Sequence, residues 1–254
     1  QSGMQLRILT YNIHRAIGID RRFRPERIVR ILDHYDADIC LLQEVDEGAP
    51  RSRELNLAKE LAEAAGYPHV AAGYNVSLRK GRYGNATLSK FPIVRERNID
   101  LTIGKRKRRG CQHTTIEAEV LKGHMHQLEI FNLHLGLSAR ERERQAGLLV
   151  RSEEFAALEE TTSCLVAGDF NDWRSRLRPI FTEALLFASA SERKSHPVLN
   201  RDIRTYPSFS PSGALDKVFY RGGLTKRGCF RCRMQVSKVA SDHSPLIADF
   251  ELHD

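Results

Sequence analysis

Eight polar residues lie at or near the ends of short apolar stretches of the sequence or, in one case, inside such a stretch. They are of the types that bind metal ions, move protons or donate hydrogen bonds to anions. The eight are Asn12, Glu44, His134, Asp169, Asn171, Asp216, Asp242 and His243. Each has an ordinary structural explanation when taken alone, such as a turn-forming Asn or a solvated acid. Together they supply every group that metal-assisted hydrolysis of a phosphoester requires.

That chemistry explains why these residue types matter. A hard divalent cation such as Mg²⁺, or Mn²⁺ in its place, takes carboxylate and amide oxygens as ligands and neutralises phosphate oxygens and the departing oxygen. Histidine with a carboxylate partner is the usual base near neutral pH. Neutral donors such as Asn and His stabilise charge that develops on the phosphoryl oxygens.

Two segments give the strongest local evidence for a functional site. Asp216 is predicted inside an apolar strand, where an acid is costly unless it is paired, and a histidine partner would remove that cost. Gly168 lets the backbone approach closely at the end of a buried strand. Strand alternation then points Asp169 and Asn171 the same way, although Gly-Asp-x-Asn can also form a turn.

The elements that position these residues are short. Hydrophobic periodicity predicts strands over 6–11, 39–42, 84–89, 114–121, 127–133, 164–167, 214–220 and 246–252, and helices over 26–35, 54–65 and 140–158. Such a series suits either a parallel α/β protein or two packed mixed sheets covered by helices. No linker divides the chain, so residues 1–254 are expected to form one domain. Gln1-Ser2-Gly3 before Met4 is interpreted as a cloning remnant.

Composition and net charge indicate which kinds of molecule the protein binds. The hydrophobic fraction is 41% and the formal charge is +8 over 254 residues. This balance favours polyanions such as nucleic acid, phosphorylated small molecules or anionic lipid. The basic run at 105–109, which ends at Arg109, could contact phosphates, or it could be a solvated loop. No apolar run reaches the roughly 20 residues of a membrane span.

Cysteine use is that of a protein from a reducing compartment. Five cysteines are an odd number and form no disulfide framework, so a cytoplasmic location is expected. Cys229 and Cys232 form a single CxxC, which is weak evidence for zinc without a second pair of ligands. The sequence indicates no protein partner.

Six segments, taken in order, resemble the endonuclease/exonuclease/phosphatase superfamily. They are Thr10-Tyr11-Asn12-Ile13-His14, Leu42-Gln43-Glu44-Val45, Asn132-Leu133-His134, Gly168-Asp169-Phe170-Asn171, Leu215-Asp216-Lys217-Val218 and Ser241-Asp242-His243. Any one tripeptide is weak evidence, whereas six in the family's order are specific. The resemblance implies an α+β fold, a four-layer αββα sandwich of two packed mixed sheets with helices on the outer faces.

The resemblance also implies roles for these residues. Glu44 would be the principal metal ligand, with Asn12 and Asp242 nearby. His243 would be a general base or a charged phosphate contact held by Asp216. Asp169 and Asn171 would position the nucleophile and the phosphate, and His134 would donate to a phosphate oxygen. Family members differ on whether one metal or two act, and on whether Asp169 or His243 activates water.

Three readings of function remain from the sequence. The leading one is a Mg²⁺-dependent phosphodiesterase acting on nucleic acid, with Asn12, Asn171, His134 and Arg109 contacting the substrate. The second is a phosphodiesterase of the phospholipid or sphingomyelin type, or a small-molecule phosphatase. The third is a non-catalytic relative that only binds phosphate, and it predicts the loss of a site residue. The segment 204–208 before Asp216 resembles a Thr-aromatic-Pro segment of small bacterial members and is expected to line the site.

Overall fold

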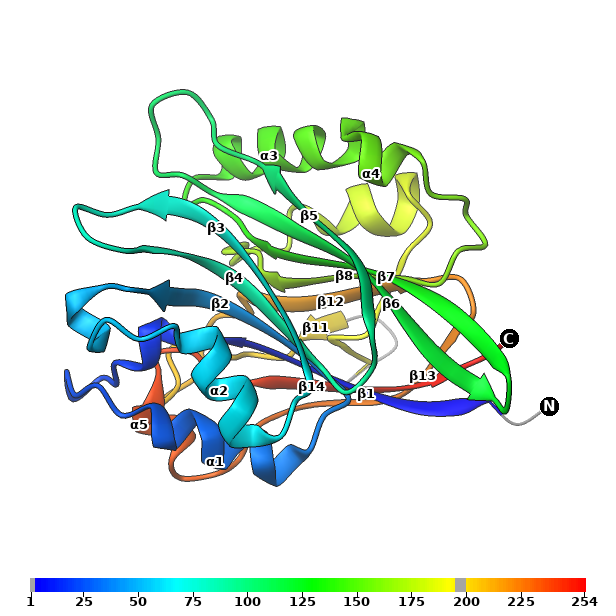
Figure 1. The fold of residues 1–254 in the computed structure, drawn as a ribbon. Helices are drawn as coiled ribbons and strands as arrows, with labels where there is room; N and C mark the ends of the chain where they lie inside the picture. The colour runs from blue at the N-terminus through cyan, green and yellow to red at the C-terminus, as the bar shows by residue number, and fades with distance from the viewer. Residues whose placement is uncertain (1–2, 195–199) are drawn as a thin grey trace.

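Two six-stranded mixed β-sheets form the centre of the protein (Figure 1). We describe it from a computed structural model covering residues 3–194 and 200–254. The first sheet contains β1 (Met4–Asn12), β2 (Ile39–Glu47), β3 (His69–Ser77), β4 (Arg82–Ser89), β13 (Leu224–Arg231) and β14 (Leu246–Leu252). Its order is β13-β14-β1-β2-β4-β3.

The second sheet has the order β5-β6-β7-β8-β12-β9. Its strands are β5 (Ile93–Asp100), β6 (Gly110–Leu121), β7 (His124–His134), β8 (Cys164–Asp169), β9 (Ala188–Ser189) and β12 (Asp216–Arg221). A separate ribbon pairs β10 (Glu192–Lys194) with β11 (Asn200–Asp202).

Helices cover the outer faces of both sheets. They are α1 (Pro25–Tyr35), α2 (Leu57–Ala65), α3 (Ala139–Arg151), α4 (Glu153–Ala156) and α5 (Ser237–Ala240), with short turns of helix at η1 (His14–Ala16), η2 (Pro50–Ser52) and η3 (Ile180–Ala184). Figure 1 shows α3 and α4 on the second sheet and α1 and α2 on the opposite side of the molecule. No helix in the described residues is long and apolar enough to cross a membrane.

Three apolar clusters hold the layers together. One lies between the sheets and includes Ile8, Leu41 and Val218. The other two pack helices against the outer faces, with Ile28 in the cluster beneath α1 and α2 and Leu149 in the cluster beneath α3. Each sheet contributes apolar side chains to clusters on both of its faces, because successive side chains of a strand point in opposite directions. The predicted four-layer αββα sandwich is therefore confirmed.

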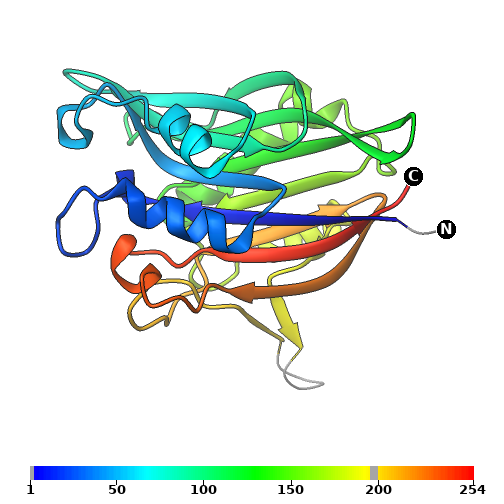
Figure 2. The same ribbon diagram turned by 60° about the horizontal axis from the view of Figure 1, so that its bottom comes forward.

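Each sheet contains one parallel pair of strands, and this arrangement places the site. β1 pairs with β2 and β7 pairs with β8 in parallel, and helices form both crossovers. The carboxyl ends of each pair therefore lie at one edge. β12 and β14 run antiparallel to β8 and β1, so their first residues lie at the same edge. The chain ends lie at the opposite edge, as Figure 2 shows, where Met4 pairs with Leu252.

A layer of buried amides joins the sheets behind that edge. Asn132 of β7 donates through Nδ2 to the carbonyl oxygens of Leu42, at 3.2 Å, and Ala86, at 3.1 Å, both in the first sheet. Its Oδ1 accepts from Gln43 Nε2 at 2.9 Å. In return, Asn85 of β4 donates to the carbonyl oxygens of Gly110 and Asn132, both at 3.2 Å. These bonds satisfy polar groups that would otherwise be buried without partners.

Several predicted boundaries were wrong, and side-chain caps explain two of them. The helix predicted over 140–158 breaks at Ser152, which has extended backbone and caps α4 by accepting from Phe155 N at 3.2 Å. The helix predicted from residue 54 begins at Leu57 because Asn56 is its N-cap. Strands β3, β5 and β13 were missed. In β5 nearly every side chain is exposed, which removes the alternating pattern.

The amide layer yields a stability prediction. Asn132→Ala removes three buried hydrogen bonds between the sheets, which are those to Leu42 O and Ala86 O and the one from Gln43 Nε2. We expect the free energy of unfolding to fall by at least about 2 kcal/mol, measured by urea denaturation. Asn98→Ala is the matched control, because this exposed amide bonds mainly Tyr74 O and Asn75. An equal loss in the two variants would contradict a special role for the layer.

Candidate active site

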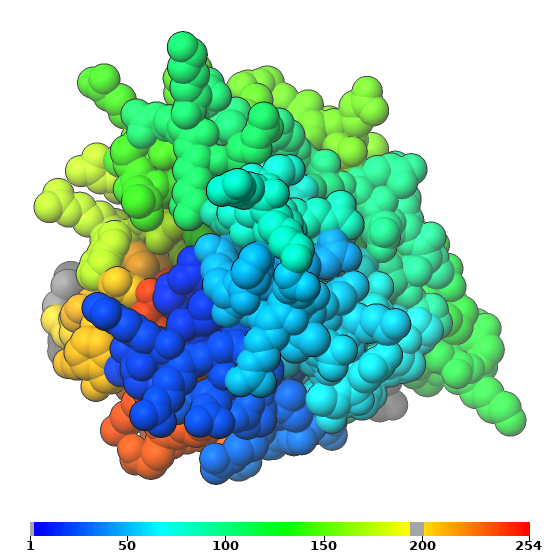
Figure 3. All heavy atoms as spheres, turned by 60° about the vertical axis from the view of Figure 1, so that its left-hand side comes forward, coloured from blue at the N-terminus to red at the C-terminus, as the bar shows by residue number. Residues whose placement is uncertain are grey.

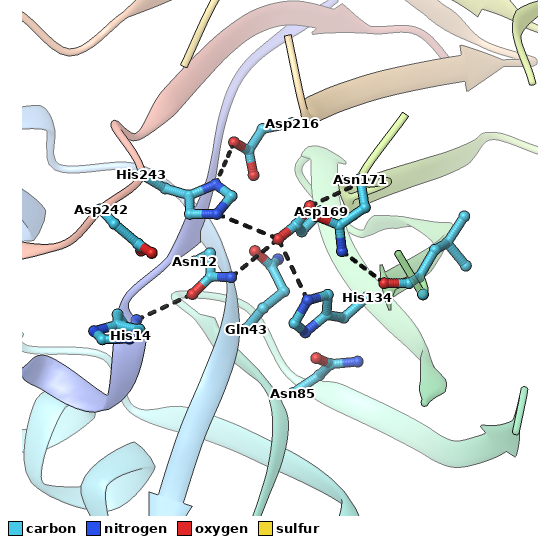
Figure 4. Close-up of polar contacts among 12 residues, drawn as sticks. Asn12, His14, Gln43, Asn85, His134, Asp169, Asn171, Asp216, Asp242 and His243 are labelled. Atoms are coloured by element: carbon cyan, nitrogen blue, oxygen red, sulfur yellow. Dashed lines mark hydrogen bonds and ion pairs between the residues drawn. The ribbon is translucent and has the colours of Figure 1, made fainter. Parts of the chain in front are cut away.

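Segments from both halves of the chain meet on one face of the molecule. Figure 3 shows that face, where segments from the beginning, middle and end of the sequence adjoin. Within it, side chains from both sheets gather around one carboxylate (Figure 4). The labelled side chains include seven of the eight residues predicted from the sequence, and Glu44 lies next to Gln43 in β2.

Asp169, the last residue of β8, is that carboxylate. It is 1% exposed. Its Oδ2 accepts from Asn12 Nδ2 at 3.0 Å and lies 3.4 Å from His134 Nε2 and 3.5 Å from His243 Nε2. Its Oδ1 accepts from the backbone N–H of Asn171 at 3.0 Å. One buried group thus contacts β1 and the segment before β14 in the first sheet, and β7 in its own.

Asp216 and His243 form the pair expected from the sequence. His243 Nδ1 and Asp216 Oδ2 are 2.8 Å apart, and both residues are buried. The hydroxyl of Thr205 donates to the same carboxylate oxygen at 2.6 Å. Asp216 is the first residue of β12 and does not lie inside a strand as predicted. Its partner nevertheless resolves the cost of burying the acid.

The flanking acids set the charge of His243. Burial alone would lower its pKa, but the charges of Asp216 and Asp169 and the bond to Asp216 raise the pKa to about 10. Burial also raises the pKa of Asp169 to about 7, against the charge of His243, with Asp216 raising it further. At neutral pH the imidazole is therefore a cation between two carboxylates, and Asp169 is poised to exchange a proton.

His134 has the opposite character. Burial lowers its pKa to about 3, and the charge of Arg109 lowers it further, although Glu44 opposes this. The ring is therefore neutral near pH 7 and can donate one hydrogen bond without carrying charge. His134 and His243 approach the same oxygen of Asp169 from two sides, one neutral and one cationic.

Glu44 owes its position to a bulge in β2. The register of β2 with β4 shifts between Leu42 and Val45, and Glu44 has a left-handed backbone with φ of 53°. Such a conformation costs a non-glycine residue of the order of 1 kcal/mol and tends to occur at functional sites. Burial would raise the pKa of Glu44, but His134, His14 and the amide of Asn12 bring it to about 2. The carboxylate stays ionised, as a metal ligand must.

Two groups of residues could hold a metal ion, and their chemistry differs. Asp169, Asp216 and His243 bring ligand-type atoms within 4.8 Å of one another, but there the imidazolium already balances the carboxylates. Glu44 and Asn12 supply a charged carboxylate and an amide oxygen, which suit a hard cation. Figure 4 shows Asp242 on the Asn12 side of His243. The donor set of Glu44, Asn12 and Asp242 therefore fits Mg²⁺ better than the trio does.

The segment after β8 is shaped by Gly168 and Asn171. A Cβ on Gly168 would lie 2.0 Å from the carbonyl oxygen of Leu133, so no larger residue fits against β7. Asn171 has a left-handed backbone with φ of 49° and donates through Nδ2 to Leu135 O at 2.7 Å. That bond and the backbone N–H bond to Asp169 Oδ1 fix Asn171 beside the carboxylate.

Arg109 is the one buried residue of the basic run. It is 6% exposed and directly precedes Gly110, which pairs with His134 across β6 and β7. Its Nε is buried without a hydrogen-bond partner among the described residues. The preceding residues 105–108 are exposed. The run therefore divides into a solvated part and one arginine beside the site.

The Thr-aromatic-Pro segment at 204–208 was expected to line the site, and in the structure Thr205 contacts Asp216 and Tyr206 lies beside His243. Sequence reasoning missed other residues that support or border the site. Asn85 lies in the strand predicted over 84–89, where nothing in the sequence set it apart. Trp173 was also missed, although the sequence contained a signal for it. It is the only tryptophan, and it closely follows Gly168-Asp169-Phe170-Asn171.

Comparison with known proteins agrees with this geometry. The family model of the Endonuclease/Exonuclease/phosphatase family matches residues 9–243. YbhP of Escherichia coli K12 is 29% identical over 255 residues, covering 97% of this chain and 96% of YbhP. A UPF0294 protein of Vibrio vulnificus is 32% identical over 197 residues, covering 69% of this chain and 62% of that protein.

Solved structures share the fold at low sequence identity. The human Nocturnin catalytic domain, determined with a bound sulfate anion, aligns with a TM-score of 0.76 at 21% identity, covering 98% of this chain and 94% of that one. An endonuclease/exonuclease/phosphatase from Beutenbergia cavernae aligns with a TM-score of 0.76 at 20% identity, covering 98% and 72%. The chain belongs to the endonuclease/exonuclease/phosphatase family, which is a family of phosphoester hydrolases.

The charge of His243 can be tested directly. Asp216→Asn removes the neighbouring charge that most raises the His243 pKa, so we expect that pKa to fall clearly below 10 in the metal-free protein, followed by NMR titration. Asp249→Asn, which alters a pair with Arg7 instead, should leave the midpoint unchanged. A His243 midpoint that is the same in wild type and Asp216→Asn would contradict the assignment.

The same shift predicts how stability depends on pH. Because the folded pKa of His243 is raised, its contribution is fully present below the ordinary histidine value of 6.5. It is lost as the pH rises toward about 10. We expect the difference in unfolding free energy between wild type and His243→Gln to shrink over that window. A difference that stays constant from pH 6 to pH 10 would contradict the raised pKa.

Proposed function

We propose that the protein is a divalent-metal-dependent phosphodiesterase that hydrolyses nucleic acid. The observation that carries the proposal is the convergence on Asp169 of a neutral histidine, a cationic histidine and two asparagines. An ionised Glu44 accompanies them at the same edge. The arrangement supplies a proton acceptor, a cation for the phosphate and neutral donors for its oxygens. The third reading, a non-catalytic relative, predicted the loss of one of these groups, and all are present.

In this proposal Asp169 and His243 divide the proton and charge chemistry. Asp169 accepts a proton from the attacking water as the water oxygen bonds to phosphorus, and the phosphorus bond to the departing oxygen breaks. The His243 cation, held by Asp216, contacts a phosphoryl oxygen. His134 and Asn171 donate to, or orient, the other oxygens. The raised pKa of Asp169 favours it over His243 as the acceptor, because His243 already carries its proton at neutral pH.

Glu44, Asn12 and Asp242 would hold Mg²⁺, or Mn²⁺, in this proposal. When bound, the ion would stabilise charge on the phosphate and on the departing oxygen. Asn12 connects the two parts of the site, because its Nδ2 donates to Asp169 and its Oδ1 accepts from His14 N at 3.0 Å. A shift of Asn12 would therefore disturb both the metal ligands and the proton acceptor.

Charge beside the site favours a polyanionic substrate. The chain carries a formal charge of +8, and the exposed basic residues 105–108 lead into Arg109 next to His134. Lys107 reaches Tyr83 of the first sheet, with its Nζ 5.5 Å from the ring centre. A structural neighbour, the 2′,3′-cyclic phosphatase ANGEL2, was solved with adenosine-2′,3′-vanadate, and another is a mannosyl-6-phosphatase. These neighbours support a phosphoester substrate in general. The proposal of nucleic acid as the substrate rests on the positive charge beside the site.

Metal dependence is tested at Glu44. Glu44→Ala should weaken Mg²⁺ binding and cut turnover at least a hundredfold, because it removes the main charged ligand. Mg²⁺ affinity by calorimetry and plasmid nicking measure the two effects. Glu54→Ala, at an exposed acid, is the control. Unchanged metal affinity and unchanged turnover in Glu44→Ala would remove Glu44 from the site.

The proton-transfer scheme is tested at its two members. Asp169→Asn and His243→Ala should each lower turnover by roughly a hundredfold or more, while circular dichroism confirms the fold. Wild-type turnover should rise with pH on an acid limb that Asp169→Asn abolishes. Near-normal rates in either variant would contradict the scheme.

Arg109 is tested against its exposed neighbour. Arg109→Gln should raise KM for an oligonucleotide more than tenfold, because it removes a buried cation beside His134 whose Nε has no hydrogen-bond partner among the described residues. Arg108→Gln should change KM little in 150 mM salt, because its charge is exposed and screened. Equal effects of the two variants would assign the run only a general electrostatic role.

The substrate class is decided by three substrates compared in Mg²⁺. We expect cleavage of supercoiled plasmid that is lost in His243→Ala. Turnover of sphingomyelin vesicles without plasmid nicking would move the protein to the lipid branch. Hydrolysis of an aryl phosphodiester alone would retain the hydrolase and reject nucleic acid as its substrate.

A further inference from the structure

Two aromatic side chains lie in line beside His243. The Tyr206 ring centre is 5.0 Å from that of His243, with 53° between the planes. The Trp173 ring centre is 5.7 Å from that of Tyr206, and the two rings are perpendicular. The line therefore runs outward from the catalytic cluster. Tyr206 directly follows Thr205 in the sequence, and Trp173 lies two residues after Asn171.

Trp173 is exposed in a way that packing does not explain. The residue is 53% exposed, although tryptophan, the largest side chain, is on average highly buried in folded proteins. Its inner edge covers Gly213, where an added Cβ would lie 2.5 Å from the ring. Gly213 in turn forms a β-bridge with Tyr206. The ring is thus held firmly from beneath while much of its surface faces solvent.

Tyr206 connects this exposed ring to the reacting groups. Burial raises the pKa of Tyr206, and the carboxylates of Asp242 and Asp169 raise it further, so its hydroxyl lies within the electrostatic reach of both acids. Ser208, two residues on, donates its backbone N–H to Asp242 O at 2.8 Å. The aromatic pair is therefore part of the wall around the catalytic cluster.

We propose that Trp173 and Tyr206 form a stacking platform that binds a nucleobase next to the scissile phosphate. The proposal rests on the proposed function and adds a recognition element for nucleotides to it. Aromatic side chains accept bases of any sequence because every base has a π-face. Arg109 adjoins His134 and the aromatic pair adjoins His243, so base and phosphate contacts come from different segments of the chain. The platform predicts a preference for single-stranded or frayed substrate without sequence specificity.

A quaternary ammonium headgroup is the other ligand that aromatic rings attract. The charge distribution disfavours it, because the chain has a formal charge of +8 and the basic run lies at the same edge. We therefore infer that the platform binds a base, and the test below includes binding of a choline headgroup as an alternative outcome.

Trp173 is the only tryptophan, so its fluorescence reports on the platform without any need for catalysis. The probes are a short single-stranded oligonucleotide, a tetrahydrofuran-abasic strand of equal length and charge, and phosphocholine, each titrated into wild-type protein in EDTA. We expect saturable quenching by the oligonucleotide at concentrations about tenfold lower than by the abasic strand. Equal responses to both strands, or a response to phosphocholine alone, would overturn the proposal.

Variants separate stacking from structural support. Trp173→Ala should lower kcat/KM for the oligonucleotide about tenfold and leave the abasic strand unaffected, and Trp173→Phe should restore most of the loss. Met125→Ala, at an equally exposed residue of the β6–β7 hairpin far from the site, is the control. Equal losses on both strands in Trp173→Ala would show a structural role and overturn the platform.

The two proposals fail in different ways. Base-dependent quenching without hydrolysis of any substrate would retain the platform and reject the proposed activity. Hydrolysis of both strands at equal rates, with no base-dependent quenching, would retain the hydrolase and reject the platform.

Discussion

The burial of Asp169 is the constraint on which the site depends. A carboxylate that is 1% exposed is tolerated only where donors surround it. Here they come from Asn12 in β1 of the first sheet and from Asn171 just after β8 of the second. The sheets must therefore be packed in register for Asp169 to be satisfied. The amide layer around Asn132 and Gln43 secures that register one layer further inside. Fold stability and site geometry thus rest on the same contacts.

The topology places different site residues on the two sheets. Two parallel pairs bring Asn12 and Glu44 together in one sheet and His134 and Asp169 in the other. Strained backbone occurs where side chains must turn into the shared space, at Glu44 and Asn171. In the proposed mechanism the first sheet would supply oxygen ligands for a cation, and the second would supply the proton acceptor and a neutral imidazole. His243, which precedes β14 of the first sheet, contacts Asp216 and Asp169 of the second.

The sandwich was predicted from six short segments in the family's order, and the same segments supplied eight candidate site residues that the structure brings to one edge of the sheets. Apolar strands that end in Asn12, Glu44 or Asp169 are visible as short patterns, and their order along the chain is specific. Other features depend on tertiary contacts. The bulge at Glu44 and the burial of Arg109 leave no periodic signal, since exposed Arg108 and buried Arg109 look alike in the sequence. The break at Ser152 was missed because a cap can lie inside a continuous amphipathic pattern.

We propose that the metal and the proton acceptor occupy separate parts of one site. The most direct test is a crystal structure with Mn²⁺, with the ion located by its anomalous scattering. We predict an ion bound by the Glu44 carboxylate with Asn12 or Asp242 beside it, while His243 keeps its bond to Asp216. An ion bound between Asp169 and Asp216 in place of the His243 contact would contradict the claim and assign both carboxylates to the metal.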